Sequence, residues 1–475
     1  MKKYIYKSLF ILPLMFFAIG CEEPLEEEVL SELAPGNFLL LEEGIMAVLN
    51  DGYGNIQARS IEAYNKVSFS GFPAGECWGR GGSIEALLTP LTNFTWDSNH
   101  RRFNDEWRLS YAGIRDANII LENIDNGEFS SQFKSEISAE AKFLRGFGYY
   151  VINDLFGTGP IFTSTTEEEL RKPKASEAEM ISQIENDLID AAAGLPLTQA
   201  LYGRATKGSA LGVLTKLYLN TRQWQKAADA AQQVIGLGIY GLFPDYLDLF
   251  KNSEEGNEEI LWTHASSSAA GGNFLNALVF PPDFPRGASQ GVFAARTYFY
   301  DAFLDGYEEG DKRKEMFITE YVSTSSGETI PGYGVDQSFP AKYEFAPDQA
   351  GPASGTDVPE VRYADILLSR AEALNEMNGP SQEAIDLINL VRARAGVTAL
   401  VTSDFTKESL RDHLLLERAW EFAFEGKARE DQKRQGVFIS RAQARGTSAQ
   451  EHHRVFPIPQ REMDSNPNIQ QNPGY

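Results

Sequence analysis

A paired helical pattern occurs twice in this chain, and it restricts the possible folds more than any other feature of the sequence. In residues 205–235, Leu211, Leu214 and Leu217 recur at helical spacing behind Thr206, a residue type that favours helix N-caps. The letters NTRQW then predict a short turn, and the apolar residues after it mark a second helix. Two antiparallel helices with small residues where they cross are typical of a tetratricopeptide-like unit.

The same pattern returns at residues 362–396, where the letters MNGPS separate two helical stripes. Because two such pairs lie far apart, we expect a mostly α-helical, tetratricopeptide-like scaffold interrupted by long insertions. The repeat helices are expected within about residues 132–235 and 362–434. Apolar periodicity predicts further single helices at residues 137–155, 180–193 and about 407–426.

Two long stretches between the predicted helices have a different composition. Residues 68–99 and 264–359 are rich in Gly and Pro, with aromatic residues interleaved. Loops of this length in a compact protein are usually functional or disordered. Since aromatic side chains can line a binding surface, we expect these two stretches to form the ligand face.

The charge of the chain excludes one class of partner. It carries 67 Asp and Glu against 43 Lys and Arg, a formal net charge of −24. So acidic a protein repels phosphate backbones. We therefore predict no nucleic-acid partner.

The N-terminus has the organisation of a secretion signal, with a basic start, an apolar run and small residues before Cys21. The apolar run of residues 9–19 is too short for a permanent membrane-spanning helix. Residues 1–20 are therefore predicted to be a signal peptide.

The letters AIGC, ending at Cys21, resemble a bacterial lipobox, in which the cysteine is lipidated and becomes the new N-terminus. Residues 21–36 would then be an acidic tether, similar to the one that accompanies outer-face display in lipoproteins of Bacteroidetes. Attached acyl chains would anchor the protein to the membrane. With Cys21 lipidated, Cys77 is the only remaining thiol, and no intrachain disulfide is expected.

Three carboxylates, Glu417, Glu421 and Glu425, are spaced by four residues and share one face of a predicted helix. Such a row could ligate a metal or serve as general acid and base. Because arginines flank it and lie on the neighbouring helical pair, we favour a buried ion-pair network instead. Neither a catalytic residue nor a metal ligand is predicted, although loop acids such as Asp336 and Asp348 leave a calcium ion open.

Four stretches together resemble one family, the SusD/RagB-type nutrient-binding lipoproteins of the Bacteroidetes outer membrane. The most specific is VFPIPQREMDSNPNIQQNPGY at the C-terminus, residues 455–475. The others are AKFLRGFGYYVINDLFGTGPI, RYADILLSRAEALNE and LLLERAWEFAFEGKAREDQKR, at residues 141–161, 362–376 and 414–434. With the lipoprotein start, the resemblance extends over essentially the whole chain.

The resemblance implies tetratricopeptide-like helices on one side and a loop-rich ligand face on the other, within one domain at residues 37–475. It further implies a cell-surface lipoprotein that covers a SusC-like TonB-dependent transporter of the outer membrane. Such a protein captures an oligosaccharide, less often a peptide, and delivers it without cleaving it. No cofactor and no enzymatic activity are implied.

The letters GECWGRGG, residues 75–82, predict where a sugar binds. A sugar presents apolar ring faces and a rim of hydroxyls, so its site combines aromatic surfaces with fixed polar groups. Trp78 supplies the aromatic surface, Glu76 and Arg80 the polar groups, and the glycines permit close backbone approach. Loops equivalent to this one often contact ligand in the family. The further predicted ligand residues are Phe280, Phe293 and Tyr333.

Three alternatives stay open at this point. A peptide or other nutrient could take the place of the glycan on the same architecture, as in RagB. A glycoside hydrolase would need paired carboxylates, and a pure interaction scaffold would need only the helical repeats. For Trp78 itself, the alternative is a buried anchor for its loop.

Overall fold

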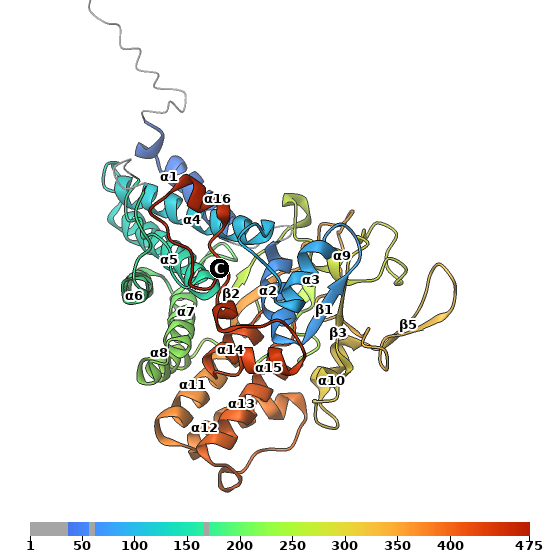
Figure 1. Cartoon of the computed structure of the whole chain (residues 1–475). Helices are drawn as coiled ribbons and strands as arrows, with labels where there is room; N and C mark the ends of the chain where they lie inside the picture. The colour runs from blue at the N-terminus through green and yellow to red at the C-terminus, as the bar shows by residue number, and fades with distance from the viewer. Residues whose placement is uncertain (1–36, 57–61, 166–170) are drawn as a thin grey trace, which may run out of the picture.

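Helices form a layer along one side of the molecule, and short strands and loops occupy the other side (Figure 1). The computed structural model describes residues 37–56, 62–165 and 171–475, so the predicted signal peptide, Cys21 and the acidic tether lie outside the described residues. The α-helices of the described part are α1 (Glu42–Ile56), α2 (Glu62–Ala74), α3 (Glu85–Asn93), α4 (Arg101–Asn123), α5 (Ser131–Phe156), α6 (Glu177–Gly194), α7 (Lys207–Asn220), α8 (Trp224–Gly236), α9 (Leu275–Val279), α10 (Asp301–Leu304), α11 (Tyr363–Asn378), α12 (Gln382–Ala395), α13 (Lys407–Glu421), α14 (Ala428–Arg434), α15 (Phe438–Ala444) and α16 (Gln460–Ser465).

The helical layer is built by neighbour-to-neighbour packing. Helix α5 packs on α6, α6 on α7, and α7 on α8. Helix α8 then contacts α11, which in turn packs on α12 and α13. The two helical pairs predicted from the sequence, α7–α8 and α11–α12, are thus confirmed and lie side by side despite their separation in the chain (Figure 1). The expected mostly α-helical, tetratricopeptide-like fold is confirmed.

Local signals in the sequence explain where these helices begin and end. Thr206 caps α7 as predicted, accepting a hydrogen bond from the backbone N–H of Ser209 at 3.2 Å. Gly396 ends α12 in the left-handed conformation, with φ 80°. The helix predicted at about residues 407–426 is shorter than expected, because α13 stops at Glu421 and Phe424 turns the chain with φ 62°.

The insertions contain short antiparallel strand pairs rather than irregular loop alone. In the described part the strands are β1 (Cys77–Arg80), β2 (Ile260–His264), β3 (Arg296–Phe299), β4 (Phe317–Ile318), β5 (Glu320–Val322), β6 (Thr329–Pro331), β7 (Phe339–Pro340) and β8 (Val358–Arg362). They pair as β1–β3, β2–β8, β4–β7 and β5–β6. Strands β1, β3 and β5 lie on the side away from the helical layer (Figure 1).

Apolar burial joins the two sides of the molecule. One continuous core runs from α1 through the helical layer to the strands, and a smaller cluster lies between α11, α12 and α13. Trp96 and Trp107, expected to pack in the core, are 5% and 2% exposed. Over the described ranges, no helix combines the length and the apolarity needed to cross a membrane.

Candidate functional site

The β1–β3 pair brings together two stretches that are more than two hundred residues apart in the sequence. The strands are antiparallel, with Cys77 opposite Phe299 and Gly79 opposite Thr297 on the buried face. Successive side chains of a strand point to opposite faces, and directly opposed residues share a face. The other face therefore carries two register pairs, Trp78–Tyr298 and Arg80–Arg296. We call this face the β1–β3 face.

The aromatic half of the β1–β3 face is Trp78 with Tyr298. Their ring centroids lie 5.4 Å apart with an interplanar angle of 49°. Tyr298 is 5% exposed, whereas Trp78 is partly exposed. The Trp78 Nε1–H donates to the backbone carbonyl of Asp336 at 3.0 Å, which fixes the indole on its neighbour. The outer indole surface is thus an oriented, partly open aromatic plate.

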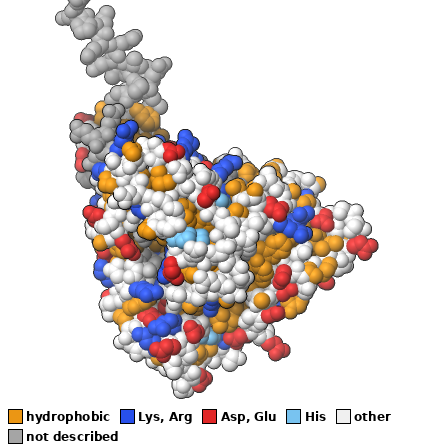
Figure 2. Space-filling model, in the orientation of Figure 1, with side chains coloured by type: hydrophobic (Ala, Val, Ile, Leu, Met, Phe, Trp, Pro, Cys, Tyr) orange, Lys and Arg blue, Asp and Glu red, His pale blue; other side chains and the backbone are white. Residues whose placement is uncertain are grey.

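The charged half is Arg80 with Arg296. Arg80 is exposed, and its Cζ lies 5.9 Å from the ring centroids of both Trp78 and Tyr298, within the range of a cation–π contact. Burial raises the pKa of Tyr298, and the positive charges of Arg296 and Arg80 oppose that rise. Figure 2 shows hydrophobic side chains gathered over the part of the molecule where β1 and β3 lie, with Lys or Arg side chains beside them.

Two further predicted residues lie on segments joined to the β1–β3 face. Phe293, 39% exposed, lies three residues before Arg296 and packs edge-to-face on Phe274. Tyr333, 48% exposed, lies three residues before the Asp336 that accepts from Trp78, and its hydroxyl donates to Asp305 Oδ1 at 2.6 Å. Both side chains remain open to a ligand.

The remaining two predicted ligand residues are buried. Glu76 is 6% exposed, and burial, with the charge of Asp431, raises its pKa to about 8 against the opposing effect of Lys342. Phe280 is 3% exposed and packs on the rings of Phe339 and Phe345. A loop position in the sequence indicated that both side chains are accessible, whereas core packing buries them. Their predicted contact with ligand stays a prediction, and the exposed residues of the β1–β3 face fit that role better.

Tyr298 and Arg296 belong to the β1–β3 face but were missing from the sequence prediction. The signal that could have found them is the alternation of RTYF, residues 296–299, which mirrors that of CWGR, residues 77–80. Alternation reveals a strand but not its partner. The pairing became visible only in the fold.

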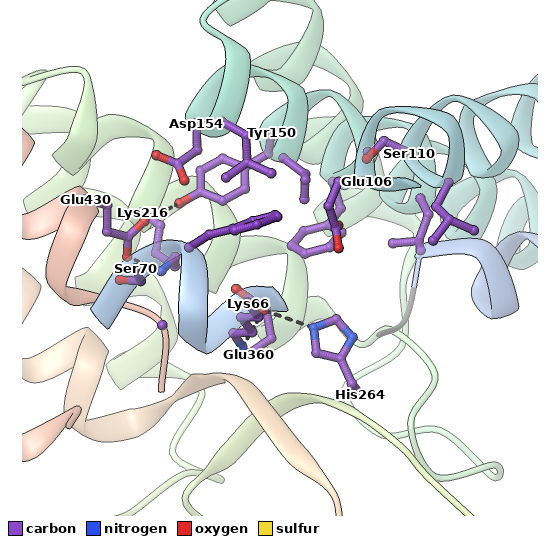
Figure 3. A pocket seen from close by; sticks show the side chains of 18 of the residues that line it. Lys66, Ser70, Glu106, Ser110, Tyr150, Asp154, Lys216, His264, Glu360 and Glu430 are labelled. Atoms are coloured by element: carbon purple, nitrogen blue, oxygen red, sulfur yellow. Dashed lines mark hydrogen bonds and ion pairs between the residues drawn. The ribbon is translucent and has the colours of Figure 1, made fainter. Parts of the chain in front are cut away.

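A separate cavity of about 110 Å³ lies inside the molecule between α2, α4, α5 and α14 (Figure 3). Figure 3 shows that charged side chains from several elements line it, namely Lys66, Glu106, Asp154, Lys216, Glu360 and Glu430. Binding pockets for drug-sized ligands usually span about 300–1,000 Å³. The cavity is thus too small for an oligosaccharide.

Two of the acids at this cavity, Glu360 and Glu430, form ion pairs with lysines. Glu360 pairs with Lys66 at 2.6 Å, and its Oε2 lies 3.0 Å from His264 Nε2. Burial disfavours ionisation of Glu360, but Lys66 and Lys427 outweigh burial and hold its pKa well below the usual range. Glu430 pairs with Lys216 at 2.6 Å. We interpret these contacts as part of the polar interior that joins the helices.

The row of glutamates on α13 and the turn after it forms the predicted buried ion-pair network. Glu417, Glu421 and Glu425 are each at most 1% exposed. Arg362 contacts Glu421 at 2.6 Å and Glu425 at 2.8 Å, while Arg313 contacts Glu417 at 2.6 Å. Further cationic partners of the row are Lys342, Arg392 and Arg394, and His413 Nε2 lies 3.4 Å from Glu417 Oε2. The favoured interpretation of this row is confirmed.

The two loop acids considered as calcium ligands each accept a hydrogen bond from a different part of the protein. Asp336 Oδ1 accepts from the backbone N–H of Asp301, while Asp348 Oδ1 accepts from Ser268 Oγ. Across residues 37–56, 62–165 and 171–475, no group of three or more acidic, histidine or cysteine side chains is arranged to hold a metal ion.

Comparison with known proteins gives consistent similarities along the chain. A model of the SusD family matches residues 307–475, and a model described as "Starch-binding associating with outer membrane" matches residues 83–219. SusD-like protein P2 of Formosa agariphila is 28% identical over 516 residues, covering 100% of both chains. The starch-binding protein SusD of Bacteroides thetaiotaomicron is 26% identical over 464 residues, covering 82% of this chain and 81% of the relative.

A solved structure described as a laminarin-binding SusD-like protein superposes with a TM-score of 0.80 at 26% identity. The superposition covers 91% of this chain and 99% of that one.

Proposed function

Because this chain is a SusD-type protein of the kind found in Bacteroidetes, we propose that it captures an oligosaccharide or polysaccharide at the cell surface and passes it on without cleavage. The observation that carries the proposal is the pairing of Trp78 with Tyr298 on the β1–β3 face, beside Arg80. This pair presents an oriented aromatic surface next to hydrogen-bond donors, which is the combination that sugars require.

Stacking on Trp78 is the central contact of the proposed site. The hydrogen bond to Asp336 holds the indole before ligand arrives, so less conformational freedom is lost on binding. Phe293 and Tyr333 provide further exposed rings on adjoining segments, as an extended chain of sugars would need. Relatives of this chain described as laminarin-binding and starch-binding support a glycan as ligand.

The three clustered glutamates are not suited to act as the acid and base of a glycosidase. Burial disfavours their ionisation, but the cations around them outweigh burial, lowering the pKa of Glu417 to about 2 and that of Glu421 further. A glycosidase needs one carboxyl group that keeps its proton near neutral pH to protonate the leaving group. Glu417 and Glu421 are committed to ion pairs instead.

The anchor and the transporter partner complete the proposal. A lipid on Cys21 would hold the protein at the outer membrane, facing the exterior, where a SusC-like TonB-dependent transporter would accept the glycan. The N-terminal sequence supports the anchor, and the family supports the outer-membrane location and the transporter partner. Metabolic labelling with a clickable fatty acid, compared between wild type and Cys21→Ala, tests the anchor, while co-purification from solubilised outer membranes tests the partner.

Calorimetry and affinity electrophoresis against a panel of polysaccharides test the binding site. We expect Trp78→Ala to weaken binding of the glycan that the wild type binds at least tenfold. Trp224→Ala is the matched control, since Trp224 is also partly exposed but lies at the start of α8 in the helical layer. Equal binding by Trp78→Ala and wild type would remove Trp78 from the site. Binding of peptides while every glycan fails would favour a RagB-like peptide binder.

A further inference from the structure

Two arginines lie directly opposite each other on the β1–β3 face. Arg80 and Arg296 form the last register pair of the strands, next to the Trp78–Tyr298 pair. Like charges in directly opposed positions of an antiparallel pair destabilise it. The arrangement therefore costs stability unless something of opposite charge lies against it.

No carboxylate of the described part of the chain forms an ion pair with either guanidinium. Arg296 donates only to the backbone carbonyl of Ala294, at 3.3 Å. Asp283 is near enough to Arg296 to feel its charge, but its two oxygens already accept from the Tyr321 and Ser323 hydroxyls. Glu85, close to Arg80 in the chain, accepts from the backbone N–H of Gly81. Most guanidinium donors at this end of the face stay available.

We propose that the glycan bound at the β1–β3 face is acidic, and that Arg80 and Arg296 hold its carboxylate or sulfate groups while Trp78 stacks on an adjoining sugar ring. This inference rests on the proposed function and adds the chemical class of the ligand. Guanidinium groups match carboxylate and sulfate because their planar fork donates two parallel hydrogen bonds. Two guanidinium groups beside an aromatic ring fit a polysaccharide in which anionic groups alternate with apolar sugar ring faces.

The net charge of −24 disfavours the approach of any polyanion from a distance, but it does not decide the contact with the two arginines. At physiological ionic strength, interactions between exposed charges are largely screened beyond about 8 Å. A bound anionic group therefore meets mainly the charges nearest to it, which are the two arginines and the carboxylates of Asp283 and Glu85, and both carboxylates already accept hydrogen bonds from the protein. Distant acids of the protein lower only the rate at which an acidic polymer approaches.

Binding of matched polysaccharides by the full mature chain tests the inference. The carboxylate arm compares polygalacturonate with its methyl-esterified form and includes alginate, whereas the sulfate arm compares carrageenan with its desulfated form. Laminarin is the neutral reference. We expect an acidic polymer to bind, its uncharged counterpart to bind at least tenfold more weakly, and the stronger arm to identify the anionic group.

Variants then assign the effect to the two arginines. Arg80→Gln with Arg296→Gln should weaken acidic binding at least tenfold and weaken any laminarin binding by a clearly smaller factor, because glutamine still donates hydrogen bonds to neutral hydroxyl groups. Arg80→Lys with Arg296→Lys keeps the positive charges but loses the planar guanidinium groups. Its affinity for the acidic polymer should therefore lie between those of the wild type and the glutamine double variant. Arg108→Gln is the control, because Arg108 is exposed on α4 and forms no ion pair in the described residues. Circular dichroism confirms that each variant is folded.

The outcomes separate this inference from the proposed function. If laminarin binds in a Trp78-dependent way and no acidic polymer binds, the inference of an acidic ligand is wrong, whereas the proposed glycan-binding function is retained. If both double variants bind the acidic polymer as tightly as the wild type, the inference is also wrong. Failure of every neutral and acidic glycan would overturn the proposed function itself, and the inference with it.

Discussion

The indole of Trp78 donates a hydrogen bond to the backbone carbonyl of Asp336, at 3.0 Å and across 258 residues of sequence. This bond joins strand β1 to the turn that carries Tyr333. Trp78 therefore has two separable roles, as a stacking surface and as a tie between the strand and the turn.

Trp78→Phe separates the two roles. It keeps an aromatic ring on the β1–β3 face but removes the Nε1–H donor. We expect it to weaken glycan binding only about threefold, against tenfold or more for Trp78→Ala, where tenfold corresponds to about 1.4 kcal/mol. The lost bond should lower the free energy of unfolding by roughly 0.5–1.5 kcal/mol, measured by chemical denaturation. Equal affinity losses in the two variants would mean that the tie, rather than the ring, controls binding.

The buried ion pairs around Glu421 predict a large stability effect with no change in ligand contact. Its side chain contacts Arg313, Arg362 and Arg394 with 0% exposure. Replacing one partner leaves buried charges uncompensated, so Glu421→Gln should lower the free energy of unfolding by about 3–5 kcal/mol. Denaturant titration followed by circular dichroism measures this loss.

Glu451→Gln is the matched control, because Glu451 pairs with Arg454 and the two side chains are 77% and 44% exposed. An exposed pair of this kind contributes about 0–1 kcal/mol, so the control should stay close to wild type. Similar losses in the two variants would contradict the structural role of the buried network. At temperatures where Glu421→Gln is folded, its glycan affinity should equal that of the wild type.

Glu76 predicts how stability depends on pH. Folding raises its pKa from the ordinary 4.5 to about 8, mainly through burial. Between these pH values the folded protein keeps a proton that the unfolded chain has released, so this group makes stability fall as pH rises towards 8. Above pH 8 its effect is constant. Below pH 4.5 it disappears.

Glu76→Gln removes this dependence because glutamine resembles the protonated acid. Since one pKa unit corresponds to about 1.4 kcal/mol, the variant should be more stable than wild type by up to about 5 kcal/mol at pH 8.5 and similar to it at pH 4.5. Melting temperatures across this range measure the effect. Glu258→Gln, at an exposed position, is the control and should follow the wild-type curve. A Glu76→Gln curve parallel to wild type would show that Glu76 is ionised in the folded protein.

The sequence predicted the helical side of this protein well. The α7–α8 and α11–α12 pairs follow from periodicity over more than a dozen residues, reinforced by the Thr206 cap and by turn residues. Such signals are local, and the apolar helix faces that they define pack against the adjacent helices. The ion-pair interpretation of Glu417, Glu421 and Glu425 succeeded because Arg392 and Arg394 lie on the neighbouring helix α12. Two further arginines of the network, Arg313 and Arg362, come from the insertion and from strand β8, and no local pattern indicated them.

The ligand side was predicted only in part, since its strands are short and pair with segments far away in the chain. Trp78 and Arg80 share a face with Tyr298 and Arg296, a relationship that no local pattern reveals. Burial also depends on the fold. Phe280 and Phe293 occur in the same aromatic loop stretch, yet one is 3% exposed and the other 39%.

The close approach of the two segments at Gly81 predicts a specific requirement for glycine. Gly81 has φ +85°, and a Cβ built there would lie 2.4 Å from the Ala294 carbonyl oxygen. Gly238 is a matched control, with φ +67° and nothing within 4 Å of a built Cβ. Both alanine variants should lose about 1–2 kcal/mol from the left-handed conformation. Gly81→Ala should lose at least about 1 kcal/mol more, because backbone must move to relieve the contact.

That movement would displace the chain just after Arg80 from the segment before Arg296. Glycan affinity, measured by calorimetry, should therefore fall in Gly81→Ala and stay unchanged in Gly238→Ala. Equal behaviour of the two variants would show that backbone conformation alone, and not the approach to Ala294, makes glycine necessary at this position.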